Sequence, residues 1–205
     1  MTKDENDELM RWVAEMNKRG MFAAQNQQDR TLMEVSTAEE WALAAKNRFG
    51  LHVTNIRACK TDPPDCYADF DSRSISIELA ELVDGKRLGK SVAAIDAGQD
   101  PPHHHGQDFL KAQWSKDRFF KELSDLINKK AAKYEKNNSV FDVLLVHTDE
   151  PWLNPQQVTD WLTQKTVEPR SVFRSAYLLM TYAPDYAHHW PVFQLFGSIA
   201  PRVLD

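Results

Sequence analysis

Asp65 and Glu78 are acidic residues on neighbouring segments that both have the residue pattern of β-strands. The second segment alternates its isoleucines with polar residues, so Glu78 projects from the face opposite the isoleucines. A hairpin that turns at residues 71–73 pairs positions whose numbers sum to about 144, which puts Asp65 opposite residue 79 and next to Glu78. Two carboxylates so close repel each other unless a cation lies between them. Because Mg²⁺ is usually held by one or two protein carboxylates, the pair predicts a site for Mg²⁺ or Mn²⁺ that lowers the pKa of bound water and stabilises charge in phosphoryl transfer.

Lys130 lies in the apolar stripe of a long helical segment, residues 107–136. With Leu123 as the origin of a helical wheel, Lys130 falls about 20° from the centre of the stripe, whereas Lys129 and Lys133 fall about 120° and about 80° away. A lysine at the centre of such a stripe either extends its ammonium group to the edge of the core or meets buried carboxylates. In the second case Lys130 is a candidate to orient an attacking water or to stabilise developing negative charge.

These residues resemble a known superfamily in their order along the chain. Pro64-Asp65, the strand ISIELAEL with Glu78, the long helix and the LLV strand at residues 144–146 are similar to the PD-(D/E)XK nuclease-like superfamily, which includes restriction endonucleases. Over about residues 37–147 the resemblance implies a restriction endonuclease-like αβββαβ core, with Asp65 and Glu78 as metal ligands. It also implies a lysine two residues after the glutamate, where this chain has Ala80. Some members carry the lysine on the following helix, and Lys130 is the candidate for that position.

The function that the resemblance implies is Mg²⁺- or Mn²⁺-dependent hydrolysis of phosphodiester bonds in nucleic acid. Asp65, Glu78 and Lys130 are then the catalytic residues, and a homodimer is one arrangement by which such enzymes cut two strands. Ala80 leaves a second interpretation open, in which the same fold is a non-catalytic binding or interaction module with an eroded site. The mild acidity of the chain, a net charge of −5, agrees with the second interpretation because it excludes a broad basic coat for nucleic acid.

Two further acids are weaker candidates. Glu81 would join Glu78 only if a bulge at the end of the strand turned it round, and the alternative is a solvated or helix-facing acid. Asp69 shares the face of Asp65 by its even spacing, but it lies near the turn, where we expect it to pair with Arg73.

Basic and metal-binding side chains outside this group carry less specific signals. Lys86, Arg87 and Lys90 follow the strand of Glu78 and are candidates for contacts with a phosphate backbone. The consecutive residues His103–His105 lack the spacing of a closed zinc site, which favours a solvated loop. Cys59 and Cys66 form no CxxC motif and no disulfide framework, and this favours reduced, unreactive thiols.

The elements that must position these residues follow from composition and periodicity. A chain of 205 residues with 42 % hydrophobic and 27 % charged residues predicts one globular domain, with a helical extension over 1–36, the core over 37–147, and a helix and strands over 148–205. Its N-terminal residues lack the features of a signal peptide and no apolar run is long enough for a membrane helix, so we expect a cytoplasmic protein without a membrane partner.

The order of the elements predicts an α/β (α+β) fold, a central mixed β-sheet flanked by helices. One helix should begin at a capping box formed by Ser36 and Glu39 and end at Gly50. The other helices are expected at 6–19, 107–136 and 155–165, a polar loop at 84–107, and strands at 51–58, 64–70, 74–83, 140–147, 175–182 and 191–196.

Overall fold

The structure, a computed structural model, describes residues 27–83, 113–150, 152–181 and 190–199. The helix expected at 6–19 and the loop expected at 84–107 therefore lie outside the described residues. The elements are α2 (Gln27–Phe49), β1 (Val53–Ala58), β2 (Cys66–Phe70), β3 (Arg73–Glu81), α5 (Lys116–Glu135), β4 (Phe141–Thr148), α6 (Pro155–Gln164), β5 (Phe173–Met180) and β6 (Val192–Gly197).

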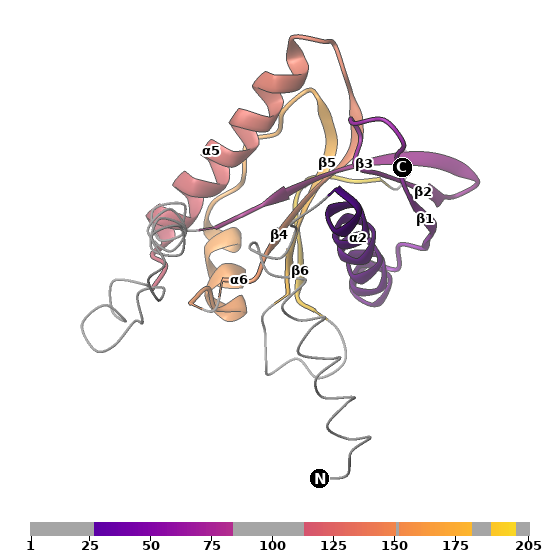
Figure 1. Ribbon diagram of the computed structural model, residues 1–205. Helices are drawn as coiled ribbons and strands as arrows, with labels where there is room; N and C mark the ends of the chain where they lie inside the picture. Colours follow the sequence, from indigo (N-terminus) through magenta and orange to yellow (C-terminus); the bar gives the residue numbers. More distant parts are fainter. Residues whose placement is uncertain (1–26, 84–112, 151, 182–189, 200–205) are drawn as a thin grey trace, which may run out of the picture. The chain divides into compact units, whose positions relative to one another are not determined.

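The strands form one mixed sheet in the order β1-β2-β3-β4-β5-β6, flanked by helices (Figure 1). The pairs β1–β2, β2–β3 and β5–β6 are antiparallel, and β4 and β5 are parallel. The structure thus confirms the predicted fold class of a central mixed sheet with helices. None of the described helices is long and apolar enough to cross a membrane.

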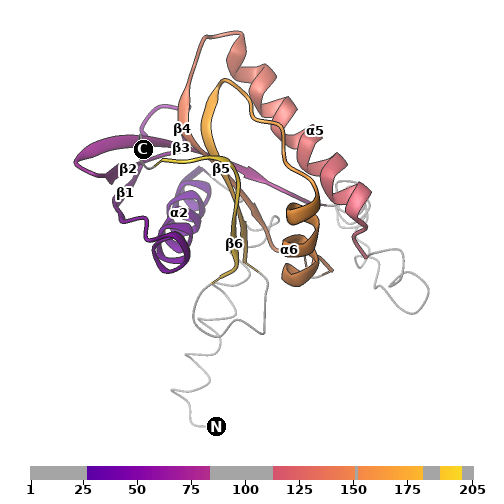
Figure 2. The ribbon, with the colours of Figure 1, turned by 180° about the vertical axis from the view of Figure 1, so that it is seen from behind.

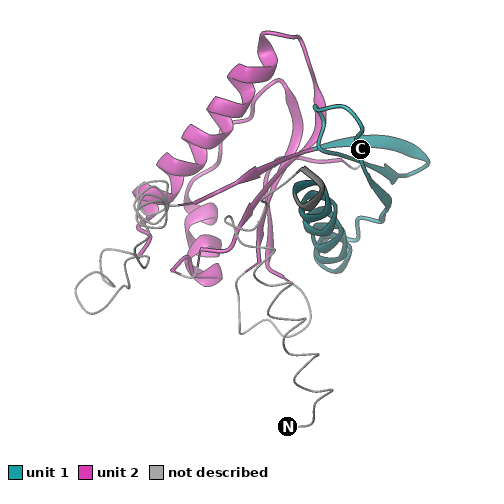
Figure 3. Cartoon of the chain, in the orientation of Figure 1, with its two compact units in different colours: residues 1–77 teal, residues 78–205 magenta. Residues whose placement is uncertain are grey.

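The chain divides into two compact units, residues 1–77 and residues 78–205 (Figure 3). The division falls inside β3, at the peptide bond between Ile77 and Glu78.

In the first unit, α2 packs against β1, and its buried side chains include Trp41 and Ala45. The predicted start of this helix at Ser36 is wrong, because α2 begins at Gln27 and Ser36 lies inside it. The residues before Ser36 are mostly good helix formers, and they continue the helix although they lack a regular apolar stripe. The predicted end is confirmed: Gly50 has a positive φ of 68°, and its N–H donates to the carbonyl of Lys46.

The hairpin of β2 and β3 turns one residue more tightly than predicted. Asp71 and Ser72 both have positive φ, which is typical of a two-residue hairpin turn, and Arg73 already pairs with Phe70. The register therefore shifts by one position, so that Cys66 lies opposite Ile77.

In the second unit, α5 and α6 pack with β4 and β5 around one apolar core (Figures 1 and 2). The described part of the long helix starts later than predicted, at Lys116, because the Ser115 side chain accepts a hydrogen bond from the Arg118 N–H and caps it. The core includes Phe119, Leu123, Ile127 and Tyr134 of α5, Val158 of α6, Leu144 and Val146 of β4, and Ala176 and Leu178 of β5.

Candidate functional site

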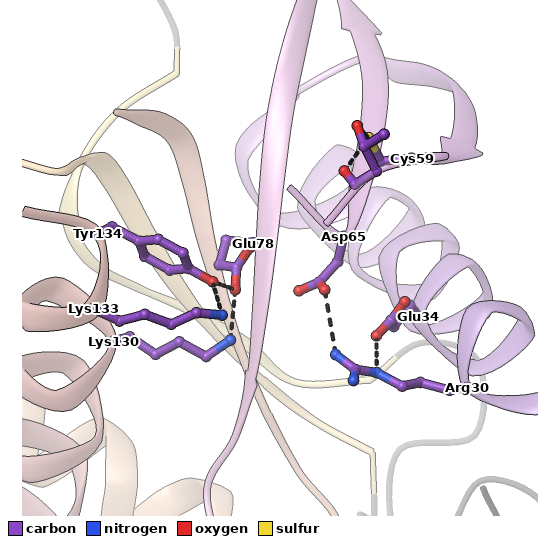
Figure 4. Close-up of polar contacts among 9 residues, drawn as sticks. Arg30, Glu34, Cys59, Asp65, Glu78, Lys130, Lys133 and Tyr134 are labelled. Atoms are coloured by element: carbon purple, nitrogen blue, oxygen red, sulfur yellow. Dashed lines mark hydrogen bonds and ion pairs between the residues drawn. The ribbon is translucent and has the colours of Figure 1, made fainter. Parts of the chain in front are cut away.

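Glu78 is the most buried acidic side chain among the described residues, with 1 % of its surface exposed. The Lys130 ammonium group donates to its Oε1 at 2.6 Å, and the Tyr134 hydroxyl donates to the same oxygen (Figure 4). A buried carboxylate is costly unless it is paired and hydrogen-bonded, and these two donors offset that cost. Lys130 thus meets a buried carboxylate, one of the two outcomes expected for a lysine in the apolar stripe.

The sequence places these groups together through two periodicities. Lys130 and Tyr134 are four residues apart, so they project from the same face of α5. Ala80 and Leu82, which are two and four residues after Glu78, belong to the core around α5. Because alternate residues of a strand share a face, Glu78 also points toward α5.

Tyr134 and Lys133 are members of this group that sequence reasoning missed as functional candidates. The Lys133 ammonium group donates to the Tyr134 hydroxyl at 2.9 Å and lies 4.7 Å from the centre of the Tyr134 ring. Tyr134 lies in the same apolar stripe as Leu123 and Lys130, and this position by itself indicates only a core residue. The signal that could have found it is the four-residue spacing from Lys130, which puts a hydroxyl donor beside the ammonium group.

Asp65, in the first unit, is also buried, with 7 % of its surface exposed. The Arg30 guanidinium group lies 3.7 Å from Asp65 Oδ1 and donates from Nε to Glu34 at 2.7 Å (Figure 4). Burial raises the pKa of Glu34, and the charge of Asp65 raises it further, while the hydrogen bond from Arg30 opposes both effects. Sequence reasoning missed Arg30 and Glu34 because it started the helix at Ser36.

The corrected register of the hairpin bears on both predicted metal ligands. Cys66 and Ile77 are a directly opposed pair. Asp65 directly precedes Cys66 at the start of β2, and Glu78 directly follows Ile77 within β3. The register of the hairpin is therefore one position shorter than the sequence predicted.

The two weaker acidic candidates have other partners. Burial raises the pKa of Glu81 to about 7, and the charges of Asp149 and Glu150, just after β4, raise it as well. Asp69 accepts hydrogen bonds from Asn55 and Arg57, each at 3.0 Å, and these lower its pKa. The expected pairing of Asp69 with Arg73 is therefore wrong, because β1 brings Arg57 to it across the β1–β2 pair.

The remaining candidates are basic residues and histidines outside the described part of the chain and two cysteines within it. Lys86, Arg87, Lys90 and His103–His105 lie outside the described residues. Cys59 and Cys66 are both free thiols, and burial raises the pKa of Cys66 to about 12, so this thiol stays protonated at neutral pH.

Comparison of the chain with protein-family models, curated proteins and solved structures finds no match. The activity is therefore argued from the residues and contacts described above.

Proposed function

We propose that the chain is a Mg²⁺- or Mn²⁺-dependent phosphodiesterase that cleaves nucleic acid, of the restriction endonuclease-like class. The observation that carries the proposal is the 2.6 Å contact between Lys130 Nζ and the buried Glu78 Oε1. The resemblance calls for a lysine two residues after Glu78, where this chain has Ala80. Lys130 of α5 brings a lysine to Glu78 instead. The element order α2-β1-β2-β3-α5-β4 agrees with the αβββαβ order of that class.

The chemistry of the acidic side chains suits a hard divalent cation. Asp62, Asp65 and Glu78 form a group that could hold a metal ion, and Asp65 and Glu78 are both buried. Their donors are all carboxylate oxygens, which are the preferred ligands of Mg²⁺ and Mn²⁺. A cation bound there would supply an activated water and stabilise negative charge on the phosphate.

Lys130 has a separate task in this proposal. Its side chain is 23 % exposed, so the ammonium group is held by Glu78 at the edge of the core rather than sealed inside it. From there it orients the attacking water and donates a hydrogen bond to the phosphate oxygen on which charge develops.

The C-terminal half of α5 supports nucleic acid as the substrate. Within residues 126–136 the charged residues are four lysines and one glutamate, in a chain with a net charge of −5. Lys129, Lys133 and Lys136 are exposed there. Exposed lysines beside the reacting groups are suited to contacts with backbone phosphates, which supply most of the affinity for nucleic acid in the absence of base contacts.

The alternative function is a non-catalytic interaction module. Ala80 favours it, because the cluster of Glu78, Lys130 and Tyr134 also satisfies a buried carboxylate without any reaction. In that case the lysines of α5 would bind a partner that remains uncleaved.

The deciding experiment combines Mn²⁺ calorimetry with cleavage assays on single- and double-stranded DNA and RNA. We expect the wild-type protein to bind Mn²⁺ and to cleave at least one substrate, and we expect Asp65→Asn and Glu78→Gln to lose both properties. Asp69→Asn is the matched control, because it neutralises a partly exposed acid of the same hairpin that binds Arg57.

Two results would overturn the proposal. One is a wild-type protein that neither binds Mn²⁺ in the presence of an oligonucleotide nor cleaves it. The other is undiminished cleavage by Asp65→Asn and Glu78→Gln. Binding of nucleic acid without cleavage or metal dependence would establish the interaction module instead.

A further inference from the structure

Tyr134 lies between a lysine and the buried carboxylate on which the proposed metal site depends. Its side chain is 1 % exposed, and its hydroxyl donates to Glu78 Oε1 and accepts a hydrogen bond from Lys133. Figure 4 shows Tyr134 and Lys130 reaching Glu78 from one side, both from α5, with Lys133 of the same helix beside the Tyr134 hydroxyl.

The position of the hydroxyl is fixed by packing. The Tyr134 ring meets Phe141 edge to face with its centre 4.7 Å away, and Phe173 lies at 6.5 Å in a similar orientation. An aromatic ring held in this way has few rotamers, so its hydroxyl stays at one place. The Lys130 ammonium group, in contrast, ends a flexible four-carbon chain that is partly exposed.

The direction of the hydroxyl proton is fixed by Lys133. A protonated lysine only donates hydrogen bonds, so the Tyr134 oxygen accepts from Lys133 and its own proton points to Glu78. Lys133 thereby orients the hydroxyl through the Tyr134 oxygen.

We propose that Tyr134 is a positioning residue that fixes the Glu78 carboxylate in the orientation needed to bind the metal ion, with Lys133 orienting its hydroxyl. This inference rests on the proposed function, because it requires Glu78 to be a metal ligand. Partners that orient a ligating carboxylate typically contribute about 10- to 100-fold to metal affinity. A purely structural tyrosine would contribute to folding stability alone.

The test is Mn²⁺ calorimetry, together with electron paramagnetic resonance spectra of the bound Mn²⁺, on four forms of the full chain. They are the wild type, Tyr134→Phe, Lys133→Met and Tyr177→Phe. Tyr134→Phe keeps the ring and its packing and removes only the hydroxyl. Tyr177→Phe is the matched control, because Tyr177 is fully buried on β5 and lies on the face opposite Ala176 and Leu178, which pack around α5.

We expect Tyr134→Phe to weaken Mn²⁺ binding by about tenfold and to alter the zero-field splitting of the bound ion, since the carboxylate loses its fixed orientation. Lys133→Met should change the Mn²⁺ affinity and the zero-field splitting in the same direction but by less. Tyr177→Phe should change neither quantity. Nucleic acid is absent, so a phosphate contact of Lys133 does not enter the measurement.

The inference is overturned if the wild type binds Mn²⁺ and Tyr134→Phe has the same affinity and the same spectrum. If Tyr134→Phe does not fold, unchanged binding by Lys133→Met overturns it. A wild type that binds no Mn²⁺ either alone or with an oligonucleotide added contradicts the proposed function itself, and this failure is distinguishable because it occurs before any substitution is made.

Discussion

Glu78 is a buried carboxylate, so protein hydrogen-bond donors must replace the water molecules that would solvate it at the surface. Lys130 and Tyr134 both donate to Oε1, so the removal of either leaves a buried negative charge with less compensation. The cost of removing one partner of such a pair generally exceeds the net contribution of the intact pair to folding. This asymmetry makes the group testable through stability as well as through activity.

Lys130→Met should lower the free energy of unfolding by about 2 kcal/mol, less than for a fully buried pair because the lysine is 23 % exposed. The double variant Lys130→Met/Glu78→Gln should recover part of this loss, since it also removes the buried Glu78 charge that the single variant leaves without its lysine partner. Urea unfolding of the wild type, both single variants and the double variant measures the coupling. Strictly additive changes would contradict the pairing.

Glu81 should make the protein less stable as the pH rises from about 4.5 to about 7. Its pKa is raised to about 7 in the folded chain, mainly by burial, so the folded state binds more protons than the unfolded state in this interval. The full effect corresponds to about 3 kcal/mol at most. Glu81→Gln, which cannot ionise, should remove this component and should be more stable than the wild type at pH 8.

Urea unfolding of the wild type and Glu81→Gln at pH 5 and pH 8 checks the sign. His147 acts in the opposite direction, because burial lowers its pKa to about 4 and stability is then lost as the pH falls below about 6.5. The difference between the two proteins isolates Glu81, since His147 is present in both. An equal pH dependence in the two proteins would show that Glu81 titrates normally.

At the scale of the elements, the sequence predicted what regular patterns encode. The apolar run of β4 was sufficient to place this strand, and the short helix expected at 155–165 corresponds to α6 (Pro155–Gln164). The start of α2 was missed because the helix extends on the N-terminal side of Ser36, the predicted cap, through residues of good helix propensity. Arg30 and Glu34 lie in this extension and were missed for the same reason. The hairpin register was off by one because two non-glycine residues adopt positive φ at the turn, which their types only weakly indicate.

The C-terminal half of α5 should contribute electrostatic affinity for nucleic acid. Lys129→Gln/Lys136→Gln removes two exposed charges and should weaken binding at low salt and lower the salt-dependence slope by about 1.8 on double-stranded DNA. Lys116→Gln/Lys121→Gln is the matched control on the same helix, because these lysines already bind Gln164 and Asp125.

Fluorescence anisotropy with a labelled duplex at several salt concentrations measures the slope for both pairs of substitutions. Equal slopes for the two double variants would show that α5 has no preferred contact with the backbone.

At the scale of the whole molecule, the mixed sheet follows from the order of elements, because β4 and β5, which a helix separates, are parallel, whereas β2 and β3, which a short turn joins, are antiparallel. The αβββαβ order could thus be predicted from periodicity alone. The partners of Glu78 could be predicted only in part: the helical wheel identified Lys130, whereas the hydroxyl of Tyr134 was indistinguishable from an ordinary core aromatic group.

Asp65 and Glu78 are the two buried carboxylates among the proposed metal ligands. A ligand that binds only the native state raises the free energy of unfolding by mass action, by about 2.7 kcal/mol at one hundred times its dissociation constant. For a chain of this length that corresponds to a rise of about 5 to 10 °C in the unfolding midpoint. Saturating Mn²⁺ should therefore stabilise the wild type and Asp69→Asn to the same extent.

The same Mn²⁺ concentration should leave the unfolding midpoints of Asp65→Asn and Glu78→Gln unchanged, because each lacks one of the two ligands. Differential scanning calorimetry with and without Mn²⁺, followed by excess chelator, measures the shift and its reversal. If only Glu78→Gln lost the stabilisation, the ion would be held without Asp65, and the proposed pairing of the two carboxylates would be wrong. If neither variant lost it, the ion would bind elsewhere on the chain, and the metal-dependent mechanism would have no basis in these residues.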